Sequence, residues 1–398
     1  MNGCPNRIVL DGVPQVGFYR GGVRCPEDII LPSVVRSVLE YLGEPDYGCR
    51  HCPALNSVCK VPCTYAFLVG VSGAASFLSW KEGWEGDNVA PFYMSANPEA
   101  PEQRIFRAIG YAYEWVANEP GRDNETLFRE RIAESIGRGM PVLGYGVIGP
   151  PEASIIAGYD EGGDVLLGWS FFQDSPVFNA GVEFEPADDG EGTGYFRKRD
   201  WFAGTGWLLV IGDKVDKPPL RETYREALGW MLEVARTPMV RPEPDAPEWY
   251  RQRHNGLAAY DAWAEHLLRD DAWPADDEAT LRAHHRIHDD AVGTVAEARW
   301  YGSAFLASGA EHFAAGPGNP GAAESILHAA AYYAAEHDLM WALWDLAGGN
   351  GNPEAHRAMA DPAVRRQMVA IIRQARDKDS QAADHLEQAL RQAEEVSQ

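Results

Sequence analysis

Two apolar runs joined by a glycine-rich turn constrain the fold of this 398-residue chain more than any other feature. The runs "ASIIAGYDE" (153–161) and "DVLLGWSFF" (164–172) both have the composition of strands, and the turn "DEGGD" joins them. Glycine tolerates the positive φ angles of a tight turn, so this pattern predicts an antiparallel hairpin. Residues 141–149 and 206–214 predict two further strands, which would extend the hairpin into a sheet.

Helical patterns accompany these strands. Residues 32–43 and 124–139 have apolar residues spaced three or four apart, and glycine ends both segments. Together with the strands, they predict an α+β domain over residues 1–215, with helices packed on an antiparallel sheet. After "KVDKPPLRE" (214–222), whose two adjacent prolines disfavour helix and sheet, nearly every segment has helical spacing. We therefore expect an all-α helical bundle over residues 216–398.

The composition limits the classes of partner. An apolar share of 45% excludes wholesale disorder, and a formal net charge of −24 at pH 7 disfavours nucleic acid and anionic membranes. No stretch approaches the roughly 18 apolar residues of a membrane span, and the first residues lack the pattern of a secretory signal. We therefore expect a cytoplasmic protein that binds neither nucleic acid nor membranes, with self-association into a homo-oligomer left open.

All six cysteines lie within the first 63 residues. In "CRHCPALNSVCKVPC" (49–63), Cys49, Cys52, Cys59 and Cys63 could close a tetrahedral zinc site. Zinc is therefore a candidate cofactor, while unliganded thiols and a single reactive thiol remain alternatives. Cys63 is the first candidate for a reactive thiol, because a helix beginning just after it would favour the thiolate.

Several segments together resemble the papain-like cysteine peptidase superfamily, in particular the bacteriocin leader peptidases and the butirosin-type acyltransferase N-terminal family. The resemblance covers about residues 8–215 and implies a papain-like fold. In those families a glutamine precedes a cysteine at the start of a helix, and a later segment containing "GYD" supplies a histidine with its orienting partner. The matching segments are "VPQVGFYRGG" (13–22), "SVVRSVLEYLG" (33–43), "VSGAASF" (71–77), residues 137–169 and "GYFRKRDW" (194–201).

The catalytic positions that the resemblance implies are not matched. Counting back from Gly43, the nucleophile falls within residues 31–34, where the chain has no cysteine; Cys25 precedes this stretch. Counting back from "GYD", the histidine falls on the three residues "EAS" that begin at Glu152. The domain therefore either lacks the papain mechanism or uses a different set of residues.

Two functions from different classes stay open. In the first, a bacterial accessory protein of secondary metabolism, degenerate in its peptidase chemistry, binds a small molecule or peptide in a pocket under residues 146–154. Tyr145, Asp160 and Trp169 are its candidate ligand contacts, although aromatic residues in such strands also fill cores.

In the second function, the chain is an amide-bond hydrolase or acyltransferase. Cys25 or Cys63 would be the nucleophile, and Glu152 would act as the base in place of an imidazole, with its pKa raised by burial. Gln15 would donate to an oxyanion, as the resemblance implies for the family glutamine. The alternative for Glu152 is a turn carboxylate that accepts backbone hydrogen bonds, so whether the chain is an enzyme stays undecided.

Histidines are concentrated in the second half of the chain. "LRAHHRIHDDA" (281–291) places His284 and His288 four residues apart, on one face of a helix. With histidines from other helices they could hold a metal in a bundle core. The simpler interpretation, which we favour, is a solvated polar face.

Overall fold

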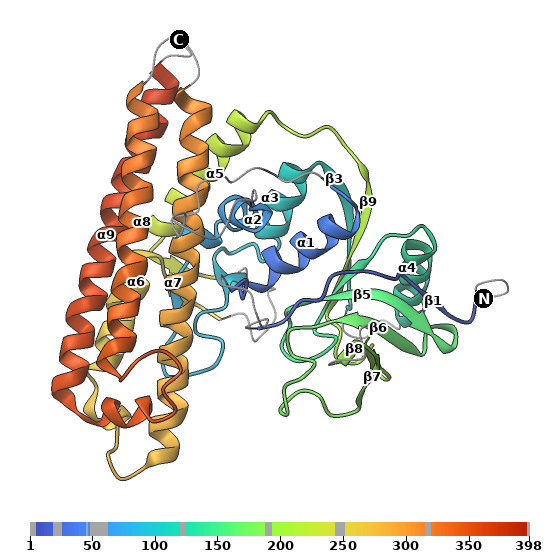
Figure 1. Ribbon diagram of the computed structural model, residues 1–398, viewed down its shortest axis with the longest axis horizontal. Coiled ribbons are helices and arrows are strands. Elements are labelled where there is room, and N and C mark those ends of the chain that lie inside the picture. Colours follow the sequence, from blue (N-terminus) through green and yellow to red (C-terminus); the bar gives the residue numbers. More distant parts are fainter. Residues whose placement is uncertain are drawn as a thin grey trace. The chain divides into compact units, whose positions relative to one another are not determined.

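The computed structural model divides into two compact units, each built from two segments of the chain (Figure 1). The first unit comprises residues 1–45 and 106–217, and the second comprises 46–105 and 218–398. The structure describes residues 5–18, 26–44, 47, 63–119, 124–187, 193–242, 251–314 and 320–395.

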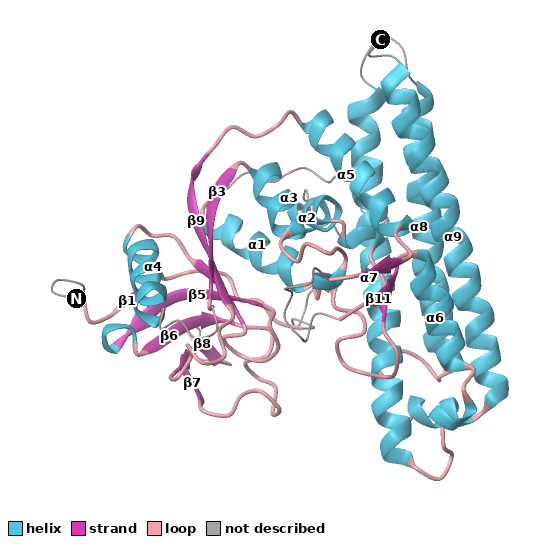
Figure 2. Ribbon diagram, turned by 180° about the vertical axis from the view of Figure 1, so that it is seen from behind, coloured by secondary structure: helices cyan, strands magenta, loops and turns pink. Residues whose placement is uncertain are grey.

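An antiparallel sheet forms the centre of the first unit. Within the described residues it has eight strands, which Figure 2 shows in magenta. The predicted hairpin is confirmed: β5 pairs with β6, and Gly162 and Gly163 have positive φ in the turn between them. The strand order is β3 (Tyr111–Ala117), β9 (Trp207–Lys214), β4 (Val142–Tyr145), β5 (Ala153–Asp160), β6 (Val165–Trp169), β8 (Thr193–Lys198) and β7 (Val182–Pro186), with β1 (Ile8–Val9) also paired with β5.

Helices α1 (Ile30–Tyr41) and α4 (Glu125–Gly137) lie against opposite faces of this sheet. Side chains alternate between the faces along each strand, and a register shift in β5 between Ile156 and Gly158 reverses this alternation in the second half of that strand. Leu143 of β4 faces α1, whereas Tyr159 of β5 faces α4. Both helices were expected from their spacing, and α1 begins two residues before the predicted start at residue 32.

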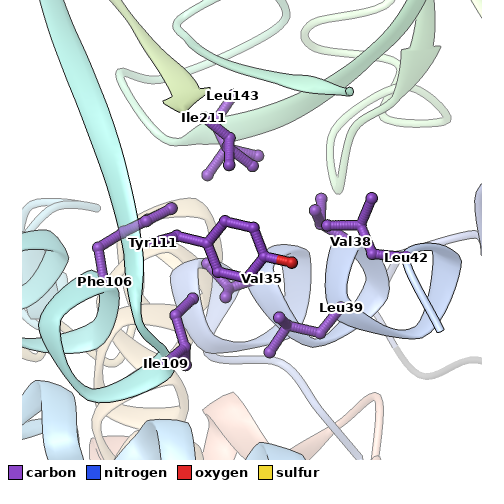
Figure 3. Close-up of a pocket in the computed structure, with 9 residues that line it drawn as sticks. All are labelled: Val35, Val38, Leu39, Leu42, Phe106, Ile109, Tyr111, Leu143 and Ile211. Atoms are coloured by element: carbon purple, nitrogen blue, oxygen red, sulfur yellow. The ribbon is translucent and has the colours of Figure 1, made fainter. Parts of the chain in front are cut away.

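Figure 3 shows an apolar hollow between α1 and the sheet. It encloses about 250 Å³ of space that is partly shared with solvent. Except for the phenol of Tyr111, its lining is hydrocarbon, and none of the lining residues belongs to 146–154. The hollow is therefore a gap in the core packing and differs from the pocket predicted under the 146–154 segment. Its lining residues are Val35, Val38, Leu39, Leu42, Phe106, Ile109, Tyr111, Leu143 and Ile211.

The second unit is mostly helical, and α7, α8 and α9 run side by side within it (Figure 1). The helical C-terminal half is thus confirmed, but two short strands depart from the all-α prediction: β10 and β11 form a small sheet with β2. The elements are α2 (Thr64–Ser72), β2 (Ser79–Trp80), α3 (Ala100–Ile109, shared with the first unit), α5 (Leu220–Arg236), β10 (Met239–Val240), β11 (Arg253–Asn255), α6 (Leu257–Leu267), α7 (Glu278–Ala314), α8 (Pro320–Leu346) and α9 (Pro362–Glu395), with short 3-10 turns at 74–76, 91–93, 270–272 and 355–360.

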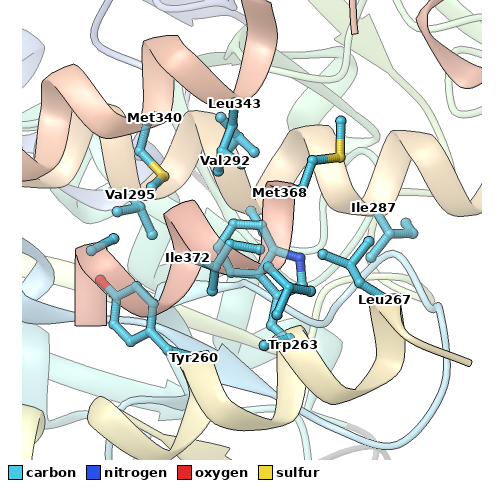
Figure 4. Close-up of a cluster of buried hydrophobic side chains, with 14 of the residues drawn as sticks. Tyr260, Trp263, Leu267, Ile287, Val292, Val295, Met340, Leu343, Met368 and Ile372 are labelled. Atoms are coloured by element: carbon cyan, nitrogen blue, oxygen red, sulfur yellow. The ribbon is translucent and has the colours of Figure 1, made fainter. Parts of the chain in front are cut away.

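Side chains from α6, α7, α8 and α9 meet in one hydrophobic cluster (Figure 4). Trp263, Val292 and Ile372 in this cluster are completely buried. Burying each side chain of this size contributes about 1.5–3 kcal/mol, so the cluster holds the four helices together. Asp361 accepts the Ala363 N–H at 2.7 Å and so caps the start of α9.

The compact units differ from the predicted domains 1–215 and 216–398 in one stretch. The described residues of this stretch, 47 and 63–105, pack with the helical half, because α2 is apolar on every side and nearly all of it is buried. Gly70 of α2 lies directly against the Phe305 ring of α7, and Tyr65 stacks edge-on against Tyr301 at 4.6 Å. Such contacts link segments more than 200 residues apart, so local sequence patterns do not reveal them.

None of the described helices combines the length and apolar character needed to cross a bilayer.

Candidate functional site

The candidate site begins at the turn between β4 and β5, residues 146–152. The Gly146 N–H donates to the Glu152 carbonyl at 3.2 Å and closes the turn. Gly146 has a φ of 81°, and a Cβ there would lie 2.5 Å from the Gly204 carbonyl oxygen. Only glycine fits this position, so the turn has a fixed path that places Glu152 at the start of β5.

Glu152 carries an unusual carboxyl group. Its side chain is half-buried, and burial raises its pKa from 4.5 to about 7. Within the described residues, this carboxyl has no hydrogen bond or ion pair. A carboxyl with this pKa exists in both protonation states near neutral pH, so it can donate to or accept from a bound molecule.

The two residues after Glu152 occupy the other expected histidine positions. Ala153 pairs with Tyr145 and therefore faces α1, whereas Ser154 pairs with Gly144 and faces the opposite side. The Ser154 hydroxyl is buried and has no hydrogen-bond partner in the described part of the chain. The amino-acid sequence of the first unit contains no histidine, so this unit has no imidazole of its own.

The loop that carries Gln15 is tied to both the sheet and α1. Trp169 Nε1 donates to the Val13 carbonyl at 2.8 Å, and the Ser37 hydroxyl of α1 donates to the Pro14 carbonyl. Gln15 itself is half-buried, and its amide makes no hydrogen bond with the described residues. The loop therefore carries an amide donor that has no partner among the described residues, and the predicted role of Gln15 towards an oxyanion stays a prediction.

Three phenylalanines form an aromatic shelf, which we define as Phe18, Phe172 and Phe178. Phe18 is 43% exposed and lies 5.5 Å from Phe172, which lies 5.5 Å from Phe178, itself 40% exposed. The Phe172 ring also packs on Gly149 of the 146–152 turn. The shelf therefore joins the Gln15 loop to the Glu152 turn and exposes an apolar surface there.

Gln173 follows the shelf and has a second unused amide. Its side chain is 2% exposed, and its Oε1 accepts the Ser170 N–H at 3.0 Å. Its Nε2 has no partner among the described residues. Buried polar groups are nearly always hydrogen-bonded, so this amide is an exception among the described residues.

The three residues that were predicted to contact a ligand interact instead with other residues of the first unit. Tyr145 is 2% exposed and stacks on Trp207 at 5.3 Å. The Trp169 indole N–H donates a hydrogen bond to the Val13 carbonyl, as described above. Asp160 forms ion pairs with Arg7 at 2.8 Å and Arg197 at 3.0 Å.

Burial opposes ionisation of Asp160, but hydrogen bonds from the Glu161 N–H, Arg7 and Arg197 outweigh it and lower its pKa. Its carboxylate therefore has internal partners. Tyr145, Asp160 and Trp169 shape the first unit, and their contact with a ligand stays a prediction.

Of the cysteines, only Cys63 lies among the described residues; Cys25, Cys49, Cys52 and Cys59 lie outside them. Cys63 caps α2, and its sulfur accepts the Ala66 N–H at 3.4 Å, so the predicted place at a helix start is confirmed. Cys63 belongs to the second unit and Glu152 to the first. The cysteine–glutamate pair and the four-cysteine zinc site both stay predictions.

His288 is buried, so the predicted solvated face was wrong for this residue, whereas His284 and His285 are half-buried. The His288 side chain is 3% exposed, and its Nδ1 accepts the Trp263 indole N–H at 3.2 Å. Burial lowers its pKa to about 3, so it is a neutral core residue. Within the described ranges, no group of three His, Cys, Asp or Glu side chains could hold a metal.

Sequence reasoning missed an ionic cluster in the second unit. Arg299 of α7 contacts Asp379 of α9 at 2.6 Å and Glu336 of α8 at 3.3 Å, and all three side chains are fully buried. Burial raises the pKa of Glu336 to about 8. Because the cluster has no exposed surface, its role is to hold α7, α8 and α9 together. The only indication of it in the sequence was the presence of three charged residues at core positions of the helical pattern.

No family model matches the sequence. A comparison with curated proteins likewise finds no match.

Proposed function

We propose that the first unit binds a small molecule or peptide at a site formed by the Glu152 turn, the Gln15 loop and the aromatic shelf. The observation that carries the proposal is the Glu152 carboxyl, which has a pKa of about 7 and no partner among the residues that the structure describes. It lies on the turn that contacts the half-buried Phe172 ring, which packs against the exposed rings of Phe18 and Phe178. Surface sites that combine an apolar wall with a few unused polar groups are typical of ligand binding.

The chemistry of the site favours an amide or peptide with an apolar side chain. The shelf offers a surface for an aromatic or aliphatic group. Gln15 has an amide N–H donor that could meet a ligand carbonyl, and Glu152 could accept a ligand N–H. An anionic ligand is disfavoured, because the chain carries a formal net charge of −24.

Binding is favoured over papain-type catalysis by the composition of the first unit. The papain mechanism needs an imidazole to move the proton between nucleophile and leaving group. The first unit has no histidine, and the implied positions hold Glu152, Ala153 and Ser154. We therefore assign the unit as a degenerate peptidase-like fold in an accessory protein, whose place in secondary metabolism is part of the same proposal.

A second candidate function rests on the same carboxyl. A base is most effective when its pKa lies near the working pH, and the pKa of Glu152 is about 7. An amide-bond hydrolase or acyltransferase could use it with Cys25 or Cys63 as nucleophile. Rapid alkylation of one cysteine by iodoacetamide at pH 7, together with loss of amide or thioester turnover in its Ala variant, would replace the binding proposal with this one.

Binding can be tested on the full chain with N-acetyl-phenylalaninamide and a defined library of tripeptide amides, by thermal shift and then calorimetry. We expect Phe172→Ala and Glu152→Ala each to weaken binding about tenfold. A tenfold loss of affinity corresponds to about 1.4 kcal/mol, the size expected when one well-made contact is removed. Val177→Ala, at a position 74% exposed next to the shelf, and Glu183→Gln, at an exposed carboxylate, are matched controls that should change affinity less than about twofold. Equal losses in variants and controls would refute the site.

A further inference from the structure

A tryptophan of α8 is unusually exposed in the second unit. Trp341 has 44% of its surface accessible, although tryptophan is on average among the most buried residues. Its ring lies 5.0 Å from that of Trp344 and 6.2 Å from that of His337, which lies 4.5 Å from Trp300 of α7. We call these four residues, Trp300, His337, Trp341 and Trp344, the indole stripe.

Hydrogen bonds hold the rings of the indole stripe in place. His337 Nδ1 contacts the Ala296 carbonyl at 2.9 Å, so this nitrogen carries the proton, and Nε2 accepts the Trp341 indole N–H at 3.0 Å. The Trp344 indole N–H donates to Asp289 at 2.6 Å. The indole N–H groups of Trp341 and Trp344 are therefore satisfied inside the unit, and a partner would meet oriented ring surfaces at little entropic cost.

Two exposed carboxylates flank Trp341. Asp338 precedes it by three residues and Asp345 follows it by four, so all three lie on one side of α8, about one helical turn apart. Neither carboxylate has an ion pair within the part of the chain that the structure describes. By contrast, many exposed carboxylates of the second unit are paired, such as Asp384 and Glu387 with Arg236.

An indole between two unpaired carboxylates has the chemistry that recognises arginine. A guanidinium can stack on an indole while its N–H groups donate to a neighbouring carboxylate. Lysine, with a compact and strongly hydrated charge, uses such a surface less well. A second copy of this chain is a poor occupant, because two chains with a net charge of −24 repel each other.

We propose that the indole stripe binds an arginine-bearing segment of a partner protein, with a guanidinium stacked on Trp341 and paired with Asp338 or Asp345. Tryptophan and arginine are the residues most enriched at the energetic centres of protein interfaces. The proposal gives the helical half a role of its own, and it does not depend on the function proposed for the first unit.

The test uses the full chain and fluorescein-labelled nona-arginine and nona-lysine peptides, with binding followed by anisotropy at physiological salt. We expect the arginine peptide to bind at least about fivefold more tightly than the lysine peptide, and Trp341→Ala to weaken it about tenfold. The double variant Asp338→Asn/Asp345→Asn should weaken it by a similar factor. Because these side chains are exposed, the variants should fold, and circular dichroism checks this.

Two control variants distinguish specific binding at the indole stripe from unspecific attraction to the negative charge of the chain. Leu327→Ala removes another apolar side chain of α8 that is 50% exposed, and Asp271→Asn/Asp276→Asn removes two exposed carboxylates elsewhere in the second unit. Both should change the affinity less than about twofold. Equal weakening by the two double variants, or equal binding of the arginine and lysine peptides, would overturn the proposal in favour of unspecific electrostatic attraction.

Discussion

Replacing Glu152 with glutamine should make the protein more stable at alkaline pH. The pKa of this carboxyl is about 7 in the folded protein against 4.5 for an ordinary glutamate, so the folded state holds the proton more tightly than the unfolded chain. The contribution of Glu152 to wild-type stability is therefore greatest below pH 4.5 and falls as the pH rises towards and through 7. Glutamine does not ionise, so the stability of the variant should not fall for this reason as the pH rises.

The magnitude follows from the two pKa values. At about 1.4 kcal/mol per pKa unit, a rise from 4.5 to about 7 corresponds to about 3 kcal/mol above pH 7. The side chain is only half-buried, and screening by solvent lowers the expected figure to about 2 kcal/mol. Between pH 5.5 and 8.5, the advantage of Glu152→Gln over the wild type should grow by about 1 kcal/mol.

Urea unfolding at these two pH values, followed by tryptophan fluorescence, measures the difference; both lie above the isoelectric point of about 4.8. Glu183→Gln is the matched control, because it removes an exposed carboxylate of the same unit whose loss should leave the pH dependence unchanged. If wild type and Glu152→Gln lose stability in parallel as the pH rises, the carboxyl is not desolvated and the argument for the site fails.

Two further predictions concern the second unit. Arg299→Met should destabilise the chain by about 3–5 kcal/mol, because it leaves two buried carboxyls without their cation; a loss below about 1 kcal/mol in urea unfolding would contradict the structural role of the cluster. Gly70→Ala should cost about 1–3 kcal/mol, because the added methyl overlaps the Phe305 ring. Gly229→Ala in α5, where a Cβ meets nothing within 4 Å, should instead be neutral or stabilising, and similar effects of the two alanines would refute the close packing of α2.

The strands β4, β5, β6 and β9 and the helices α1 and α4 were predictable, because their signals are local, whereas β3, β7 and β8 of the same sheet were not predicted. The β5–β6 hairpin follows from Gly162 and Gly163, and the start of α9 follows from Asp361 and Pro362. The grouping of residues 46–105 with the helical half was not predictable, because it depends on how α2 packs against α7.

The candidate site was predictable only in part. Glu152 was found because it stands where the resemblance implies a histidine, but its lack of a partner among the described residues depends on the folded surroundings. The aromatic shelf was not found, because Phe18 and Phe172 are 154 residues apart and their exposure cannot be read from the sequence. Ser154 and Gln173 were missed for the same reason, since unsatisfied groups appear only once their neighbours are known.

The most direct test of ligand binding is an NMR titration of the full chain with 13C-labelled phenylalanine and N-acetyl-phenylalaninamide as the probe. Phe18, Phe172 and Phe178 should shift together along one saturable curve, while Phe305, which lies in the core of the second unit, should not move. Assignment by single Phe→Leu variants identifies each signal. Shifts confined to phenylalanines outside the shelf, or no saturable shift with the probe and the tripeptide amides, would contradict the proposed site.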